Sequence, residues 1–126
     1  MKWKASLAQW RQERGLTTPQ DTTTTNGKPV IINMLQEELD ELASALVIHN
    51  EAETVDALAD LIVLSTNHMA QLGYDLDLVM KETLKEISSR TGSVNPATGK
   101  WEKDKSPSAQ ADWHKADYST CKVKRL

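Results

Sequence analysis

The residues most able to do chemistry in this chain are acidic side chains in a strongly apolar stretch. Glu53, Asp56 and Asp60 lie in ETVDALADLIVL, whose apolar residues would leave a helix no wide polar face. At about 100° per residue, the three acids share an arc of roughly 60°. A buried carboxylate is costly unless it is paired or binds a metal. No Lys or Arg occurs between Lys28 and Lys81, so a divalent cation is the expected partner.

A second acidic group lies shortly before the first, in QEELDEL at residues 36–42. On a helix, Glu37, Glu38 and Glu41 span roughly 100° of arc, and Glu38 borders the apolar stripe. Asp40 points to the opposite side and is expected to be a surface charge. The predicted metal ligands are Glu38, Glu41, Asp56 and Asp60, with Glu53 as a further candidate.

Several carboxylate oxygens around one site suit a hard cation. Mg²⁺ prefers octahedral oxygen coordination and usually shares its shell with water and phosphates, and Mn²⁺ is a plausible substitute. Zinc is not expected, because no His or Cys lies with the acids at zinc-ligand spacing. Neither acidic group contains the Glu-x-x-His pair that di-iron bundles use.

Metal-binding carboxylates with cations further along the chain indicate phosphate-ester or phosphoanhydride chemistry. Glu37 or Glu38 could orient or deprotonate an attacking water. Lys85 and Arg90 could bind a polyphosphate and stabilise the developing charge. Trp10 has two interpretations, packing within the first helix or stacking on a nucleobase. The chain has no P-loop, which argues against a kinase or a motor ATPase.

Four predicted helices position these residues. They cover residues 2–14, 29–49, 52–70 and 76–90. A Thr-rich loop at residues 16–28 joins the first two. Asn50 is expected to cap the third helix, and so short a link makes the second and third helices an antiparallel pair. Glu41 lies nine residues before Asn50 and Asp60 ten after it, so the two acidic groups should meet across this pair.

The expected fold class is all-α, with a four-helix bundle-like protomer that forms an oligomer. The helical catalytic domain is assigned to residues 1–90, and an irregular tail to residues 91–126. Gly, Pro, Ser and Lys are frequent in this tail, and a short helix is expected around residues 110–116. Its aromatic residues, Trp101, Trp113 and Tyr118, are expected to dock on the bundle or on a neighbouring subunit.

Composition restricts the class of protein. The formal net charge of −3 argues against a general nucleic-acid binder, and a single cysteine, Cys121, excludes an internal disulfide framework. No apolar run approaches the roughly 20 residues that span a bilayer. Because the N-terminus also lacks the apolar core of a signal peptide, a cytoplasmic location is expected.

The acidic motifs resemble those of a known family. EELDEL, then DALADLIV and GYDLDLVMKE, are similar to motifs of the MazG-like all-α nucleoside triphosphate pyrophosphohydrolases, which include dimeric dUTPases and the phosphoribosyl-ATP pyrophosphohydrolase-like group. The likeness covers about residues 29–90, and WRQERG resembles part of the family's first helix. It implies Mg²⁺-dependent cleavage between the α and β phosphates, which yields a nucleoside monophosphate and pyrophosphate. It also implies a dimer or a dimer of dimers.

The resemblance also assigns residues. The family's Glu-x-x-Glu motif is matched by Glu38 and Glu41, with Glu37 as an added acid. In its second motif the acid before the apolar run is Asp60, and Asp56, one turn earlier, replaces the usual Glu. A register of Glu53-x-x-Asp56 is the alternative.

Two hypotheses of different classes follow. The first is a Mg²⁺-dependent nucleoside triphosphate pyrophosphohydrolase that controls or cleans the nucleotide pool. The second is a non-catalytic helical module for nucleotide binding or oligomerisation. The first requires metal binding and pyrophosphate release, whereas in the second metal neither binds nor stabilises the fold.

Overall fold

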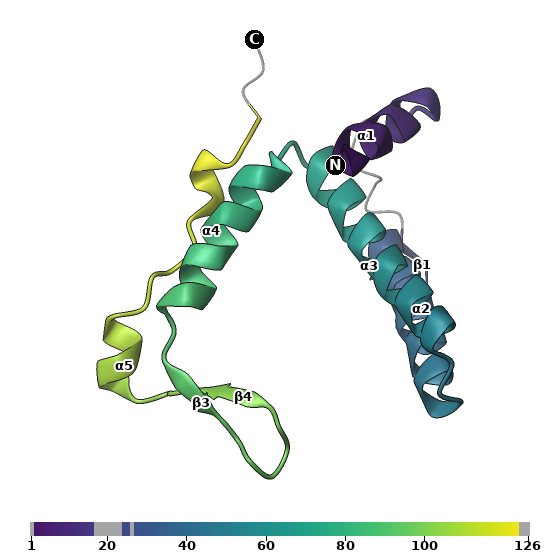
Figure 1. The fold of residues 1–126 in the computed structure, drawn as a ribbon. Helices are drawn as coiled ribbons and strands as arrows, with labels where there is room; N and C mark the ends of the chain where they lie inside the picture. Colours follow the sequence, from purple (N-terminus) through teal and green to yellow (C-terminus); the bar gives the residue numbers. More distant parts are fainter. Residues whose placement is uncertain (1, 17–23, 26, 124–126) are drawn as a thin grey trace. The chain divides into compact units, whose positions relative to one another are not determined.

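The structure, a computed structural model, describes residues 2–16, 24–25 and 27–123 and is mostly helical, as the sequence predicts (Figure 1). The chain divides into two compact units, residues 1–73 and residues 74–126. The carboxylates predicted to bind metal all lie in the first unit. None of the helices in the described part of the chain is long and apolar enough to cross a membrane.

Three helices build the first unit. They are α1 (Trp3–Glu13), α2 (Val30–Val47) and α3 (Glu51–Gln71). Strand β1 (Thr24–Thr25) pairs antiparallel with β2 (Lys28–Pro29) just before α2. The predicted helices are confirmed to within a few residues. Most of the predicted Thr-rich loop lies outside the described residues.

The link between α2 and α3 fixes how these two helices pair. At the end of α2 the backbone N–H of Asn50 donates to the carbonyl of Ala45 at 2.9 Å, and that of His49 donates to Leu46 at 3.2 Å. These are the two bonds of a Schellman motif, with His49 in the left-handed position at φ 55°. The Asn50 side chain then accepts from the N–H of Glu53, which confirms it as the predicted cap. Helices α2 and α3 therefore run antiparallel and side by side (Figure 1).

A second Schellman motif ends α1. The N–H of Leu16 donates to the carbonyl of Arg11 at 2.9 Å, and Gly15 occupies the left-handed position at φ 69°. The carbonyl of Leu16 in turn accepts from Gln71 Nε2 near the end of α3, at 3.2 Å. The end of α1 is therefore attached to the end of α3.

The second unit contains one long helix and a structured tail. Its elements are α4 (Leu76–Ser89), β3 (Gly92–Val94), β4 (Trp101–Lys103), α5 (Pro107–Ala111) and a 3₁₀ turn (Tyr118–Thr120). Asp75 caps α4 by accepting from the N–H groups of Asp77 and Leu78.

The tail is more regular than the sequence suggested. Strands β3 and β4 form an antiparallel hairpin in which Gly92 lies opposite Lys103. A Cβ at Gly92 would stand 2.2 Å from the carbonyl of Glu102, so this pairing requires glycine. The helix expected around residues 110–116 was misplaced, because α5 begins earlier, at Pro107. Ser106 caps it by accepting from the N–H of Ala109, and proline suits a first helical position.

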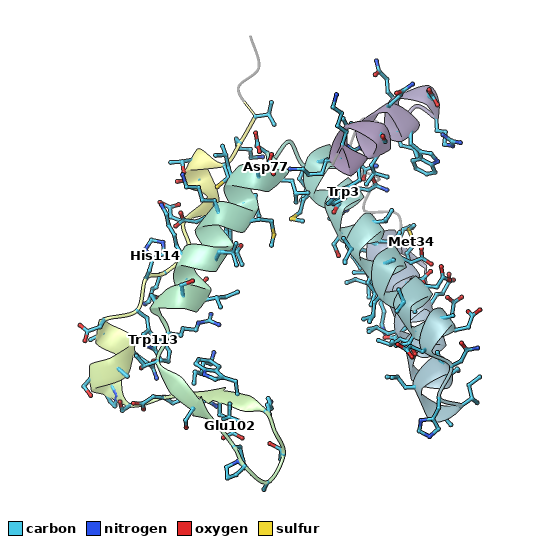
Figure 2. All side chains as sticks on the ribbon, viewed as in Figure 1. Trp3, Met34, Asp77, Glu102, Trp113 and His114 are labelled. Atoms are coloured by element: carbon cyan, nitrogen blue, oxygen red, sulfur yellow. The ribbon has the colours of Figure 1, made fainter. Side chains whose placement is uncertain are left out.

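The last part of the tail is attached to α4 by hydrogen bonds. Glu82 of α4 contacts His114 Nε2 and accepts from the N–H of Asp117 at 3.1 Å. These bonds favour the carboxylate form and lower the pKa of Glu82, with the Asp117 N–H as the largest cause. Tyr118 and Thr83 share a hydrogen bond between their hydroxyls at 2.8 Å. His114 lies beside α4 in Figure 2.

Large apolar side chains are not enclosed by the single chain. The buried apolar residues of the described part are small or medium in size: Ala45, Ala57, Val79 and Cys121. The sequence indicated that α3 is buried on nearly every side, yet Leu58 is 45% exposed and Ile62 is 58% exposed. The expectation of a buried α3 is therefore wrong for one chain by itself.

We expect His49→Val to destabilise the protein and His49→Gly to stabilise it. The left-handed backbone costs an L-residue about 1–2 kcal/mol, and a β-branched side chain tolerates it least, whereas glycine adopts it freely. The gain for glycine should be below about 1 kcal/mol, since glycine also increases the entropy of the unfolded chain. Urea unfolding monitored by circular dichroism measures both changes, and an equal loss of stability in the two variants would contradict this account of the turn.

Candidate metal centre and neighbouring pocket

Three of the predicted ligands come together between α2 and α3. Glu38 and Glu41 lie one turn apart on α2, Asp60 faces them from α3, and one carboxylate oxygen of each lies within 4.8 Å of the others. The antiparallel pairing brings them level, as the distances from Asn50 predicted. Glu38 and Asp60 are partly buried, whereas Glu41 is exposed.

Glu38 has the most unusual environment of the three. Its Oε2 atom is buried and has no hydrogen-bond partner in the described structure. The pKa of Glu38 is raised from its ordinary value of 4.5 to about 7. Burial is the largest cause, followed by a hydrogen bond with Glu41 and by repulsion from Glu41, Asp60 and Asp56.

These observations fit a divalent metal ion. Like charges held this close repel one another, and a buried carboxylate oxygen without a donor lacks compensation. A hard cation would supply both the opposite charge and the missing partner. The donors are all carboxylate oxygens, which suit Mg²⁺ or Mn²⁺, with water or phosphate completing the shell.

The other acids of the two groups lie around this centre without joining it. Asp56 is exposed, but its charge contributes to the raised pKa of Glu38, so it acts electrostatically on the same site. Glu37 and Glu53 are exposed, and their roles stay predictions. Asp40 accepts a hydrogen bond from Gln36 at 3.0 Å on the exposed face of α2, which agrees with its interpretation as a surface charge.

The predicted phosphate-binding cations belong to the second unit. Arg90 follows α4, and its Nη2 lies 3.0 Å from Oε1 of Glu86. Lys85 Nζ lies 3.9 Å from Oε2 of Glu82. Both cations are therefore associated with acids of their own helix, and their binding of substrate stays a prediction.

A cavity of about 190 Å³ lies along the same two helices as the carboxylate cluster. Its lining is mostly apolar, with an aromatic ring and several polar side chains: Trp10, Leu16, Val30, Ile31, Met34, Val63, Leu64, Asn67, His68 and Gln71. Met34 is labelled on α2 in Figure 2. Cavities with apolar walls and a few polar groups are typical of small-molecule sites.

The cavity and the carboxylate cluster share one face of each helix. Asn67 follows Asp60 by seven residues, which is about two turns or roughly 10 Å along α3. On α2, Met34 and Ile31 precede Glu38 by about one and two turns in the same spatial direction. A ligand with a charged end and an apolar end could therefore occupy both sites at once.

The sequence offered Trp10 as a residue that packs in the first helix or stacks on a nucleobase. It did not predict the polar residues of α3 that line the cavity. Asn67 and Gln71 lie one turn apart and, at 100° per residue, close to the helix face of Asp60. This spacing was visible in the sequence. It carried no signal by itself, because polar residues near the end of a helix are usually solvated.

Comparison with protein-family models matches residues 6–86 to phosphoribosyl-ATP pyrophosphohydrolase, abbreviated PRA-PH. This match covers well over half of the chain. The chain belongs to the PRA-PH family. Membership confirms the resemblance to the MazG-like all-α group and indicates a pyrophosphohydrolase. No match was found among curated proteins or among solved structures.

The carboxylate cluster of this PRA-PH protein should make its response to Mg²⁺ depend on pH. Because the folded-state pKa of Glu38 is raised from 4.5 to about 7, the metal-free fold favours the protonated form. The stability linked to this protonation is fully present below pH 4.5 and is lost as the pH rises to about 7. Mg²⁺ should therefore raise the midpoint of thermal unfolding at pH 8 and have little effect at pH 5.

The matched variant is Glu38→Gln, which cannot ionise. In the metal-free protein at pH 8 it should unfold at a higher temperature than the wild type, and Mg²⁺ should shift its midpoint less. Thermal unfolding with and without MgCl₂ across this pH range measures these effects. An equal Mg²⁺ shift at pH 5 and pH 8 in the wild type would contradict the assignment.

Proposed function

We propose that this protein is a Mg²⁺-dependent nucleoside triphosphate pyrophosphohydrolase, which converts a (d)NTP to a (d)NMP and pyrophosphate for nucleotide-pool control or house-cleaning. The observation that carries the proposal is the cluster of Glu38, Glu41 and Asp60, with an unpartnered buried oxygen on Glu38. Membership of the PRA-PH family supports the reaction class. Such a role places the enzyme in the cytoplasm.

The carboxylates would hold the metal, with Asp56 as a fourth acid beside the three that converge. When bound, Mg²⁺ would screen the phosphate charge and help to orient the α-phosphate. Glu37 or Glu38 would take the proton of the attacking water. The water oxygen forms a bond to the α-phosphorus, the bond from the α-phosphorus to the bridging oxygen breaks, and pyrophosphate leaves.

The cavity beside the metal centre would hold the nucleoside. Its apolar walls suit a flat heterocycle, and the ring of Trp10 offers a stacking surface. The carboxylates and the cavity follow one another along the helices. This order agrees with a nucleotide, in which the sugar separates the base from the α-phosphate. Lys85 and Arg90 would bind the β and γ phosphates after exchanging their present acidic partners.

We infer further that the protein works as a homodimer or a homotetramer. The single chain leaves large apolar side chains of α2 and α3 exposed to an extent that is unusual for a monomer: Ile32, Leu39, Leu46, Val55, Leu58 and Ile62. A second copy of the chain would cover such a surface. Obligate interfaces of this kind resemble a domain core divided between two chains.

Purified protein with Mg²⁺ should release pyrophosphate, and not orthophosphate, from at least one nucleoside triphosphate. Glu38→Gln and Asp60→Asn should each lower kcat by about 10²–10⁴-fold, as expected when a group that supports proton transfer or the metal is lost. Ion-exchange chromatography of the products separates monophosphate from diphosphate. Asp40→Asn is the matched control, since it removes an acid of α2 outside the cluster, and it should retain full activity.

Two results would contradict this assignment. Full activity in Glu38→Gln and Asp60→Asn would exclude the carboxylate cluster as the active site. The absence of pyrophosphate release from every natural or modified triphosphate would favour the non-catalytic helical module instead.

Light scattering after size-exclusion chromatography should give two or four times the chain mass of 14.1 kDa. Ile62→Lys places a charge on the exposed apolar face of α3 and should shift the protein toward monomer. Glu51→Lys, at the exposed start of the same helix, is the control and should leave the mass unchanged. A wild-type mass of 14.1 kDa across the micromolar range would contradict the oligomer.

A further inference from the structure

We propose that Asn67 recognises the nucleobase edge as a hydrogen-bond donor and that Arg11 is the positioning residue that fixes this polarity. The inference rests on the proposed function and concerns base selection at the same site. Its basis is one hydrogen bond between α1 and α3, together with the cavity that Asn67 lines.

Arg11 decides which end of the Asn67 amide turns toward the cavity. Arg11 Nη1 lies 2.8 Å from Asn67 Oδ1. A guanidinium has donors and no acceptor, so only the amide oxygen can face it. The Nδ2 group of Asn67 must therefore point away from Arg11, and the side chain forms no other hydrogen bond with the described residues. Asn67 lines the cavity, whereas Arg11 does not.

Gln71 has its polarity fixed in the opposite sense. Its Nε2 donates to the carbonyl of Leu16 at 3.2 Å. A carbonyl can only accept, so Gln71 presents Oε1 as the remaining acceptor. Asn67 and Gln71 lie one turn apart and both line the cavity. The cavity is thus equipped with an oriented donor and an oriented acceptor close together.

This pair complements a heterocycle that carries an acceptor beside a donor. Nucleobase edges have this pattern, with a carbonyl or ring nitrogen next to an N–H or amino group. A phosphate would offer acceptors alone and would suit cations better than an apolar cavity with neutral amides. The ring of Trp10 in the same lining adds the stacking surface that a flat base requires. The ligand class for this cavity is therefore a nucleobase with an acceptor facing Asn67.

Fixed polarity gives selectivity, because a base that places a donor opposite Asn67 leaves two donors facing each other. A well-formed pair of such bonds discriminates by about 1–3 kcal/mol, or roughly 5- to 150-fold in kcat/KM. If the amide were free to rotate by 180°, Asn67 could accept or donate, and this discrimination would fall. The contact with Arg11 prevents that rotation.

The test compares kcat/KM for the four dNTPs among the wild type, three variants of Asn67 or Arg11 and one control variant. Asn67→Asp keeps an oxygen toward Arg11 and replaces the donor with an acceptor. The kcat/KM for the preferred dNTP should therefore fall roughly 5- to 150-fold relative to the values for the other dNTPs. Arg11→Met frees the Asn67 amide to rotate and should reduce the differences in kcat/KM among the four dNTPs. Arg11→Lys restores a donor facing Asn67 and should restore these differences. Gln12→Met, at the exposed next position of α1, is the control and should match the wild type.

A structural role for Arg11 would give a different pattern, namely a lower unfolding temperature and an equal loss of kcat/KM for every base. That pattern, or an unchanged base preference in Asn67→Asp, overturns the inference. If the wild type hydrolyses dNTPs to pyrophosphate and only the base preference fails to respond, the proposed function stands without this inference. If the wild type releases no pyrophosphate from any natural or modified nucleoside triphosphate, both are overturned.

Discussion

The candidate site of the first unit is defined by three carboxylates that lie close enough to repel one another. Glu38, Glu41 and Asp60 converge across α2 and α3, and burial of Glu38 makes its ionisation still less favourable. The short link around His49 makes this possible, because its two backbone hydrogen bonds and the Asn50 cap leave little freedom in the pairing of the helices. The connection is short, and the site that it creates brings together carboxylates that repel one another. Such repulsion is common where a protein binds a cation.

The same helix pair also lines the cavity that we propose as the nucleoside site. Moving from the carboxylates along α2 and α3, the lining changes from acidic to apolar over one or two turns. Away from the carboxylates, the end of α1 meets α3: the Leu16 carbonyl that follows its Schellman motif accepts from Gln71, and Arg11 donates to Asn67. Helix α1 therefore contributes to the cavity mostly by orienting groups on α3. Its own ring at Trp10 adds the aromatic surface.

The second unit shows how a polar tail acquires a defined structure. The hairpin of β3 and β4, the cap of α5 and the contacts to α4 all depend on short-range polar chemistry, with Glu82 accepting from two separate tail positions. Apolar burial contributes little here, since Val79 and Cys121 are the buried apolar residues described in this unit. Both units leave large apolar side chains exposed, and the oligomer that we propose would bury them.

The main helices and the pairing of the acidic residues could be predicted from the sequence, because the relevant signals are local. Apolar periodicity and Asn50 as a cap predicted the four main helices, and nearly equal spacing from Asn50 placed Glu41 opposite Asp60. The hairpin of the tail and the start of α5 were not predicted, because strand pairing and helix capping compete closely in a polar segment. Tertiary structure alone decided that Glu38 has a buried, unpartnered oxygen and that Arg11 meets Asn67, 56 residues away. Burial and long-range hydrogen bonds depend on which faces pack together, and a linear pattern of residues does not contain that information.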